Sequence, residues 1–130
     1  MSIETGMTNQ ISLIVGQDDT ATALGSGTAP VLATPRMIAL MEEAAWTAIQ
    51  DGLEEDQTSV GISMNVSHLS ATPVGMEITA SAEVTAIAGR KVSFLLKAWD
   101  EKGLIGQGTH QRTVVQEEKF VCKCYEKLEA

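Results

Sequence analysis

Thr34-Pro35-Arg36-Met37-Ile38-Ala39-Leu40-Met41-Glu42 begins a segment, residues 34–51, that has the pattern of one long helix. Threonine is a favoured N-cap, and proline fits the first helical position, where an N–H has no partner. Gly52 is the expected residue just beyond the helix end. At about 100° per residue, one broad face of this helix is apolar, comprising Met37, Ile38, Met41, Ala44, Ala45, Ala48 and Ile49. The alanines in this face suit close packing against a sheet.

The segment that follows, residues 58–116, alternates between apolar and polar side chains, as half-buried strands do. Apolar side chains occupy the even positions of 60–66, 76–86 and 92–98, and a last strand covers about 104–116. Hairpins with one apolar face need a cover, which the helix supplies. We therefore predict an α+β protein in which about five antiparallel strands wrap around one long central helix.

The chain of 130 residues is expected to form a single domain, residues 1–130. A short strand at 11–15 and a loop make up its N-terminal part, residues 1–33. The C-terminal tail, residues 117–130, has the pattern of a short helix, and its cysteines, Cys122 and Cys124, are expected to be free thiols.

Composition excludes several classes of partner. A net charge of −8 makes nucleic acid a poor ligand. No apolar run approaches the roughly 20 residues that span a bilayer, so no membrane segment is expected. The first 16 residues lack the basic and apolar regions of an export signal, which favours a cytoplasmic protein. Two cysteines at this spacing are weak evidence for a metal, and none is expected.

Glu42 and His68 lie where packing alone favours apolar side chains. Glu42 is on the flank of the apolar face of the helix, about 20° from Ile49. It is either a boundary residue that reaches solvent or pairs with a lysine, or a catalytic carboxylate. His68 continues the even row that starts at Val60. It is either a satisfied core histidine or a general base paired with a carboxylate.

Thr34 and Gly61 each allow two interpretations. Helix capping fully explains Thr34, yet a hydroxyl at a helix N-terminus also suits the polarisation of a carbonyl oxygen. Gly61 interrupts a strand of good β-formers, which marks close approach of a ligand or of another backbone. Gly106 and Gly108 share that ambiguity, because they also make room for the helix.

Three stretches together resemble the fluoroacetyl-CoA thioesterase family of hotdog-fold proteins. The segment from Thr34 to Glu42 resembles the start of that family's central helix. The segment Val66-Ser67-His68-Leu69-Ser70-Ala71-Thr72-Pro73-Val74-Gly75 resembles the family's histidine strand and the turn that follows it. The segments Gly106-Gln107-Gly108-Thr109-His110-Gln111-Arg112 and Glu118-Lys119-Phe120 resemble the family's last strand and tail. The resemblance covers roughly residues 30–122, with the motifs in the same order.

The resemblance implies a hotdog fold, a homodimer with sites at its interface, and hydrolysis of acyl-CoA thioesters. Our working hypothesis is that this hydrolysis needs no metal. Coenzyme A enters only as part of the substrate, and no other cofactor is implied. The family's catalytic threonine, glutamate and histidine correspond to Thr34, Glu42 and His68. Gly61 and Arg112 correspond to positions that contact the substrate.

One departure from the family concerns the acyl group. Members selective for fluoroacetyl groups carry phenylalanines before the helix, whereas residues 25–32 here read Gly-Ser-Gly-Thr-Ala-Pro-Val-Leu. We therefore expect a small acyl group without selectivity for fluoroacetyl. Residues 90–130 hold 8 bases against 6 acids, and Arg90, Lys91 and Arg112 are candidates for the phosphates of coenzyme A. His110 is expected to be structural.

Two alternative functions use the same fold. A non-catalytic hotdog protein would bind acyl-CoA or another small ligand without turnover. A hotdog hydratase would act on enoyl-CoA. The joint presence of Thr34, Glu42 and His68 favours hydrolysis.

Overall fold

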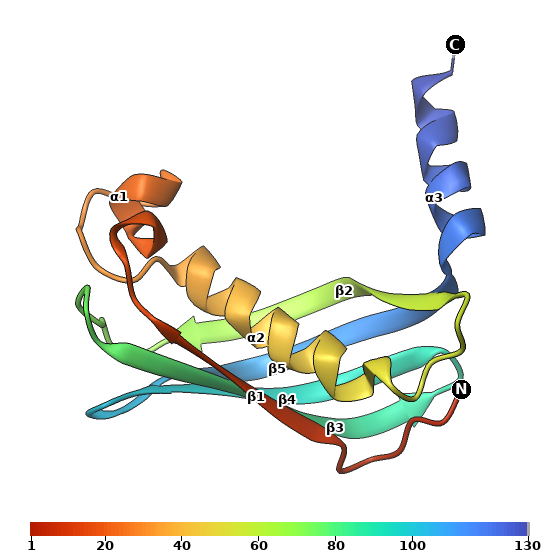
Figure 1. Ribbon diagram of the computed structural model, residues 1–130, viewed down its shortest axis with the longest axis horizontal. Coiled ribbons are helices and arrows are strands. Elements are labelled where there is room, and N and C mark those ends of the chain that lie inside the picture. The colour runs from red at the N-terminus through yellow and green to blue at the C-terminus, as the bar shows by residue number, and fades with distance from the viewer. Residues whose placement is uncertain (130) are drawn as a thin grey trace.

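An antiparallel five-stranded sheet curves around a single long helix in the computed structural model, which describes residues 1–129 (Figure 1). The helix is α2 (Thr34–Gln50). The strand order is β1-β3-β4-β5-β2, with bounds β1 (Thr8–Ile14), β2 (Gln57–His68), β3 (Glu77–Ala88), β4 (Lys91–Asp100) and β5 (Gly103–Gln116). The short helix α1 (Ala21–Leu24) precedes α2, and α3 (Glu117–Tyr125) follows β5. The predicted α+β architecture is confirmed.

The core lies between α2 and the inward face of the sheet. The helix buries six side chains, Met37, Leu40, Met41, Ala44, Ala45 and Ile49. Opposite them lie the even positions of β3 and β4, including Ile78, Ala80, Ala82, Val92, Phe94 and Leu96. Alanines on both surfaces let the helix lie close to the sheet. The helix thereby has a fixed position against the strands, and its side chains at the flank are held in place.

The predicted even row in β2 is wrong over its first half. The pairing of β2 with β5 shifts register between Gly61 and Ser63, which marks a β-bulge. A bulge inserts one extra residue and reverses the alternation of faces. Ile62 is consequently 48% exposed, whereas Met64 and Val66 pack against the core. Before the bulge it is Ser59, at an odd position, that is buried.

Two boundaries also differ from expectation. The N-cap of α2 is Ala33, and Thr34 is the first helical residue, so the predicted capping role of Thr34 is wrong. A side chain placed one residue inside the helix no longer caps its free N–H groups, and no side chain caps α2. The first strand begins at Thr8 and ends before Val15, where 11–15 was expected.

The two ends of the sheet are edge strands, β1 and β2. In a single chain, the outer edge of β2 has no strand beside it among the described residues. Helix α3 forms where a short helix was predicted, stands away from the sheet and buries none of its residues (Figure 1). No helix of residues 1–129 is long and apolar enough to cross a membrane.

Candidate active site

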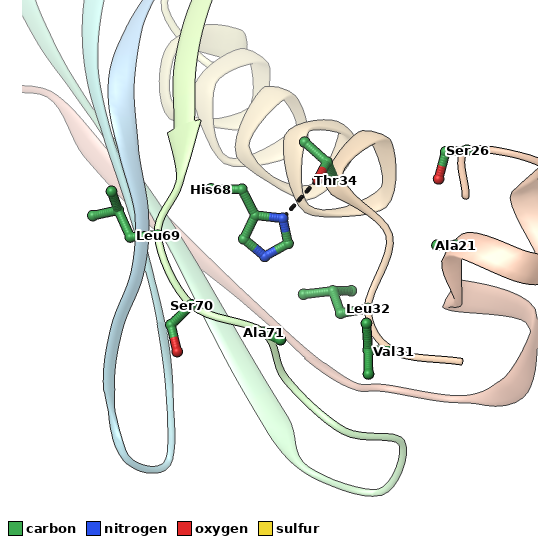
Figure 2. Close-up of a pocket in the computed structure, with 9 residues that line it drawn as sticks. All are labelled: Ala21, Ser26, Val31, Leu32, Thr34, His68, Leu69, Ser70 and Ala71. Atoms are coloured by element: carbon green, nitrogen blue, oxygen red, sulfur yellow. Dashed lines mark hydrogen bonds between the residues drawn. The ribbon is translucent and has the colours of Figure 1, made fainter. Parts of the chain in front are cut away.

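Thr34 and His68 meet at the N-terminal end of α2. The hydroxyl oxygen of Thr34 lies 2.7 Å from Nδ1 of His68, the last residue of β2 (Figure 2). Because Thr34 is at the first position of the helix and caps nothing, its hydroxyl is available for this contact. His68 was predicted to lie near the helix, and its contact with Thr34 confirms this.

The other ring nitrogen of His68 is buried and unsatisfied. Its Nε2 atom has no hydrogen-bond partner among the described residues. Leaving a buried polar atom unpaired is costly, so such an atom marks a place for a further group. Burial also lowers the pKa of His68 below its ordinary value of 6.5, so the neutral imidazole is favoured. A neutral imidazole with one free nitrogen can take up or deliver a proton.

A pocket of about 320 Å³ opens beside this pair. It lies between α1, the segment before α2 and the end of β2 (Figure 2). Its lining consists mainly of small or aliphatic side chains, including Ala21, Ser26, Val31, Leu32 and Ala71. None of the lining residues is phenylalanine, tyrosine or tryptophan, in line with the absence of phenylalanines from residues 25–32.

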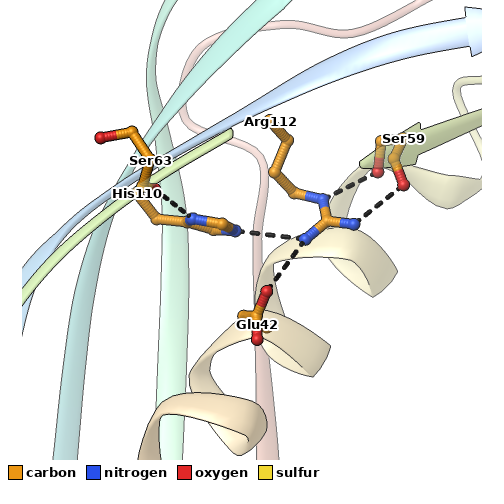
Figure 3. Close-up of polar contacts among 5 residues, drawn as sticks. All are labelled: Glu42, Ser59, Ser63, His110 and Arg112. Carbon is orange, nitrogen blue, oxygen red and sulfur yellow. Dashed lines mark hydrogen bonds and ion pairs between the residues drawn. The ribbon is translucent and has the colours of Figure 1, made fainter. Parts of the chain in front are cut away.

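Glu42 belongs to a second cluster, further along α2. One of its carboxylate oxygens, Oε2, lies 3.9 Å from Nη1 of Arg112, and its side chain is 43% exposed (Figure 3). A Cβ atom on Gly61 would lie only 3.2 Å from the same Oε2. Gly61 therefore leaves space for the Glu42 carboxylate, which explains the glycine in this strand.

Arg112 is held inside the protein by neutral groups. Its Nε donates to the hydroxyl of Ser59 at 2.8 Å and its Nη2 to the carbonyl of Ser59 at 2.9 Å. Its Nη1 contacts Nε2 of His110 at 3.2 Å. Arg112 is only 7% exposed, and its proposed contact with the phosphates of coenzyme A stays a prediction. The same holds for the substrate-contacting position that the family resemblance gives it.

The structure places the two clusters apart within one chain. Thr34 and Glu42 are eight positions apart on α2, about 12 Å at 1.5 Å per residue. Gly61 and His68 are seven positions apart on β2, about 23 Å at 3.3 Å per residue. Thr34 and His68 thus form one half of the predicted site, and Glu42, Gly61 and Arg112 form the other.

The two clusters contain no arrangement typical of a metal site. Within residues 1–129 there is no group of three or more histidine, cysteine or acidic side chains that could hold a metal ion. Cys122 and Cys124 are exposed free thiols on α3, away from both clusters.

Comparisons with known proteins point to one family. The family description "Fluoroacetyl-CoA-specific thioesterase" matches residues 15–118. The fluoroacetyl-CoA thioesterase of Streptantibioticus cattleyicolor is 40% identical over 100 residues, which span 77% of this chain and 72% of that protein. The solved structure of the fluoroacetyl-CoA thioesterase FlK superimposes with a TM-score of 0.92 at 32% identity, covering 98% of both chains.

Two further structures bear on ligand and fold. A single-residue mutant of FlK, solved with fluoroacetate and CoA, has a TM-score of 0.85 at 33% identity, over 91% of this chain and 99% of that one. A hot-dog-like protein from Thermanaerovibrio acidaminovorans has a TM-score of 0.89 at 23% identity, over 98% and 95%. The predicted hotdog fold is confirmed.

Proposed function

Because this chain belongs to the fluoroacetyl-CoA-specific thioesterase family, we propose that it hydrolyses the thioester bond of acyl-CoA molecules with a small acyl group. The observation that carries the proposal is the Thr34–His68 pair, with the unpartnered Nε2 of His68 beside a pocket of about 320 Å³. A free imidazole nitrogen beside an open pocket supplies the proton transfer that hydrolysis needs.

The proposed reaction adds one water molecule across the thioester. The water oxygen bonds to the carbonyl carbon, the carbon–sulfur bond breaks, and the products are a carboxylate, coenzyme A and a proton. Glu42 acts as general base on this water or as the nucleophile itself. His68 passes a proton to the departing thiolate, and Thr34 hydrogen-bonds its ring. N–H groups at the start of α2 stabilise the negative charge on the acyl oxygen.

We propose that two chains complete each site, as a homodimer joined along β2. Two β2 strands that pair antiparallel about a two-fold axis at Asn65 set Met64 beside Val66 of the partner subunit. Both side chains are half-buried on the inward face. This register therefore keeps the inward faces of the two sheets on the same side. The same register sets His68 opposite the bulge next to Gly61 of the partner subunit, behind which Glu42 of the partner subunit lies.

The proposed acyl specificity follows from the pocket lining. Ser26 and Val31 line the pocket from the stretch before α2, and this stretch has no phenylalanine that could serve as an aromatic gate. Without such a gate the pocket accepts short acyl groups generally. The free thiols Cys122 and Cys124 and a CoA substrate both fit a reducing compartment, and we propose the cytoplasm.

The test is a hydrolysis screen. Purified protein is mixed with acetyl-, fluoroacetyl-, branched and aromatic acyl-CoAs, and the released thiol is detected, with the Glu42→Gln variant in parallel. We expect thiol release from several short acyl-CoAs and little preference for fluoroacetyl-CoA. Tight acyl-CoA binding without thiol release from any of them would instead identify a binding protein.

A further inference from the structure

We propose that His110 is a positioning residue of this site. Its ring, fixed in a single tautomer, accepts a hydrogen bond from Arg112 and thereby holds the guanidinium of Arg112 beside Glu42. The proposal deepens the proposed thioesterase function and rests on it. It is argued from the contacts around His110, Arg112 and Glu42 (Figure 3).

The contacts of His110 fix which of its nitrogens carries the proton. Its ring is 2% exposed and stacks on Phe94 with centroids 5.7 Å apart. Its Nδ1 lies 2.8 Å from the carbonyl oxygen of Ser63. A carbonyl oxygen only accepts hydrogen bonds, so Nδ1 must be the donor. In the neutral ring Nε2 is then a bare acceptor, directed at Nη1 of Arg112 at 3.2 Å.

Arg112 depends on this acceptor for its orientation toward Glu42. Nε and Nη2 both bond to Ser59, so they hold one side of the guanidinium. Nη1 is the nitrogen that faces Glu42 at 3.9 Å, and its bonded neighbour is His110. Without the acceptor on His110, the Nη1 side of the Arg112 guanidinium is no longer held. This is the side that the Glu42 carboxylate approaches.

The backbone around His110 is shaped for the same arrangement. Ser63 directly follows the register shift of β2, so the bulge sets the carbonyl that fixes the tautomer. A Cβ atom on Gly61 would lie 3.2 Å from Cε1 of His110 as well as 3.2 Å from Oε2 of Glu42. Gly61 thus fits between the imidazole and the carboxylate.

Two substitutions separate the contacts of His110. Neither a glutamine nor an asparagine reproduces the whole imidazole, so each variant is judged by the one atom that it keeps. His110→Gln places an amide oxygen near the position of Nε2 and keeps an acceptor for Arg112. His110→Asn places an amide N–H near the position of Nδ1 and keeps the donor to Ser63. Both remove the same ring from the core, so we expect similar losses of Tm.

The kinetic result distinguishes positioning from packing. We expect His110→Asn to lower kcat about 10-fold relative to His110→Gln, with a smaller change in KM, because misplaced catalytic groups slow the chemical step. The difference should disappear in the Glu42→Gln background, because it acts through that carboxylate. Equal kcat values for the two variants, or a difference that persists without the carboxylate, would overturn the proposal.

A readout independent of activity keeps the two proposals distinct. The ¹⁵N NMR shifts of the His110 ring report its tautomer in the unmodified protein. A neutral ring protonated on Nδ1 at pH 7 supports the positioning role, and a proton on Nε2 refutes it. If the wild-type protein released no thiol from any acyl-CoA, the proposed function would fail, and this measurement would still decide the tautomer on which the positioning role depends.

Discussion

The Thr34 hydroxyl contacts Nδ1 of His68 at 2.7 Å because α2 begins one residue earlier than its sequence suggests. As the first helical residue, Thr34 has no capping bond to make. Its side chain is therefore committed to the imidazole, and Nε2 is left for whatever enters the pocket. Under the proposed function, the hydroxyl at position 34 is therefore expected to matter for activity and not for helix stability.

Replacing Thr34 tests this separation directly. Thr34→Val keeps the branched shape and removes the hydroxyl, so we expect kcat to fall about 10-fold or more. Thr34→Ser keeps the hydroxyl and should stay within a few-fold of wild type. Because Thr34 is exposed and caps nothing, neither variant should shift Tm appreciably. A large drop in Tm for Thr34→Val would show that the threonine serves the helix after all.

Removing the charge of Glu42 tests the second half of the site. Glu42→Gln keeps the shape of the side chain and should lower kcat roughly 10²-fold if the carboxylate is the base or the nucleophile. Glu43→Gln is the matched control, since it removes the same charge one position along α2. Steady-state kinetics on the best acyl-CoA compare the two. Near-normal turnover by Glu42→Gln would rule out the catalytic role.

The regular parts of this fold could be predicted because periodicity reports them. The apolar face of α2 and the alternation in β3 and β4 follow from the regular spacing of apolar residues along these elements. The bulge in β2 could not be predicted, because one extra residue leaves Val60, Ile62 and Met64 looking like a single row. Only the pairing with β5 shows that the register changes between Gly61 and Ser63.

The candidate site residues stand out in the sequence, but their arrangement in space does not. Glu42 and His68 stand out because polar side chains interrupt apolar patterns, and Gly61 stands out in a strand. His110 carries the same signal, as a polar residue in the buried row of β5 that also holds Arg112, although it was predicted to be structural. The distance between the two clusters depends on strand register and on what lies beside β2, which no local pattern encodes.

Stability should depend on pH through the chain's two histidines. Burial lowers the pKa of both His68 and His110 below the ordinary value of 6.5. The unfolded chain therefore binds more protons than the folded one just below pH 6.5, so the free energy of unfolding falls as pH drops through that range. Above pH 6.5 this contribution is fully present. Urea unfolding between pH 5 and 8 measures this pH dependence of the free energy of unfolding. His110→Gln should make the free energy of unfolding less dependent on pH. A wild-type protein whose free energy of unfolding does not change over this range would contradict the burial of neutral rings.

Binding of the coenzyme A phosphates should depend on the turn between β3 and β4. Arg90 and Lys91 are exposed there, and Arg90 borders a groove of about 970 Å³ with Lys119 and Lys123 of α3. The double variant Arg90→Ala/Lys91→Ala should raise KM several-fold with little change in kcat, because these contacts are remote from the thioester. Added salt should raise the wild-type KM in the same direction. The charge-matched control is the double variant Lys97→Ala/Lys102→Ala, which removes two exposed positive charges away from this turn. A KM insensitive to both salt and the Arg90→Ala/Lys91→Ala variant would exclude phosphate contacts at this turn.

Subunit complementation tests whether each site spans two chains. Glu42→Gln and His68→Ala are each expected to be nearly inactive alone. If His68 works with Glu42 of the partner subunit, a mixed dimer has one site with both residues intact and one site lacking both. Unfolding and refolding an equal mixture should then restore roughly a quarter of wild-type activity, since half of the dimers are mixed and each has one working site.

The same mixture gives the opposite result if each site lies within a single chain. Every chain then carries one of the two substitutions, so no dimer contains an intact site and no activity returns. Ile62→Lys provides the independent control, because Ile62 is an exposed apolar residue at the bulge of β2. A charge there should weaken the pairing of two β2 edges, shift the protein toward monomer in sedimentation, and lower kcat in proportion. A monomeric Ile62→Lys variant with full activity would show that His68 needs no carboxylate from a second chain.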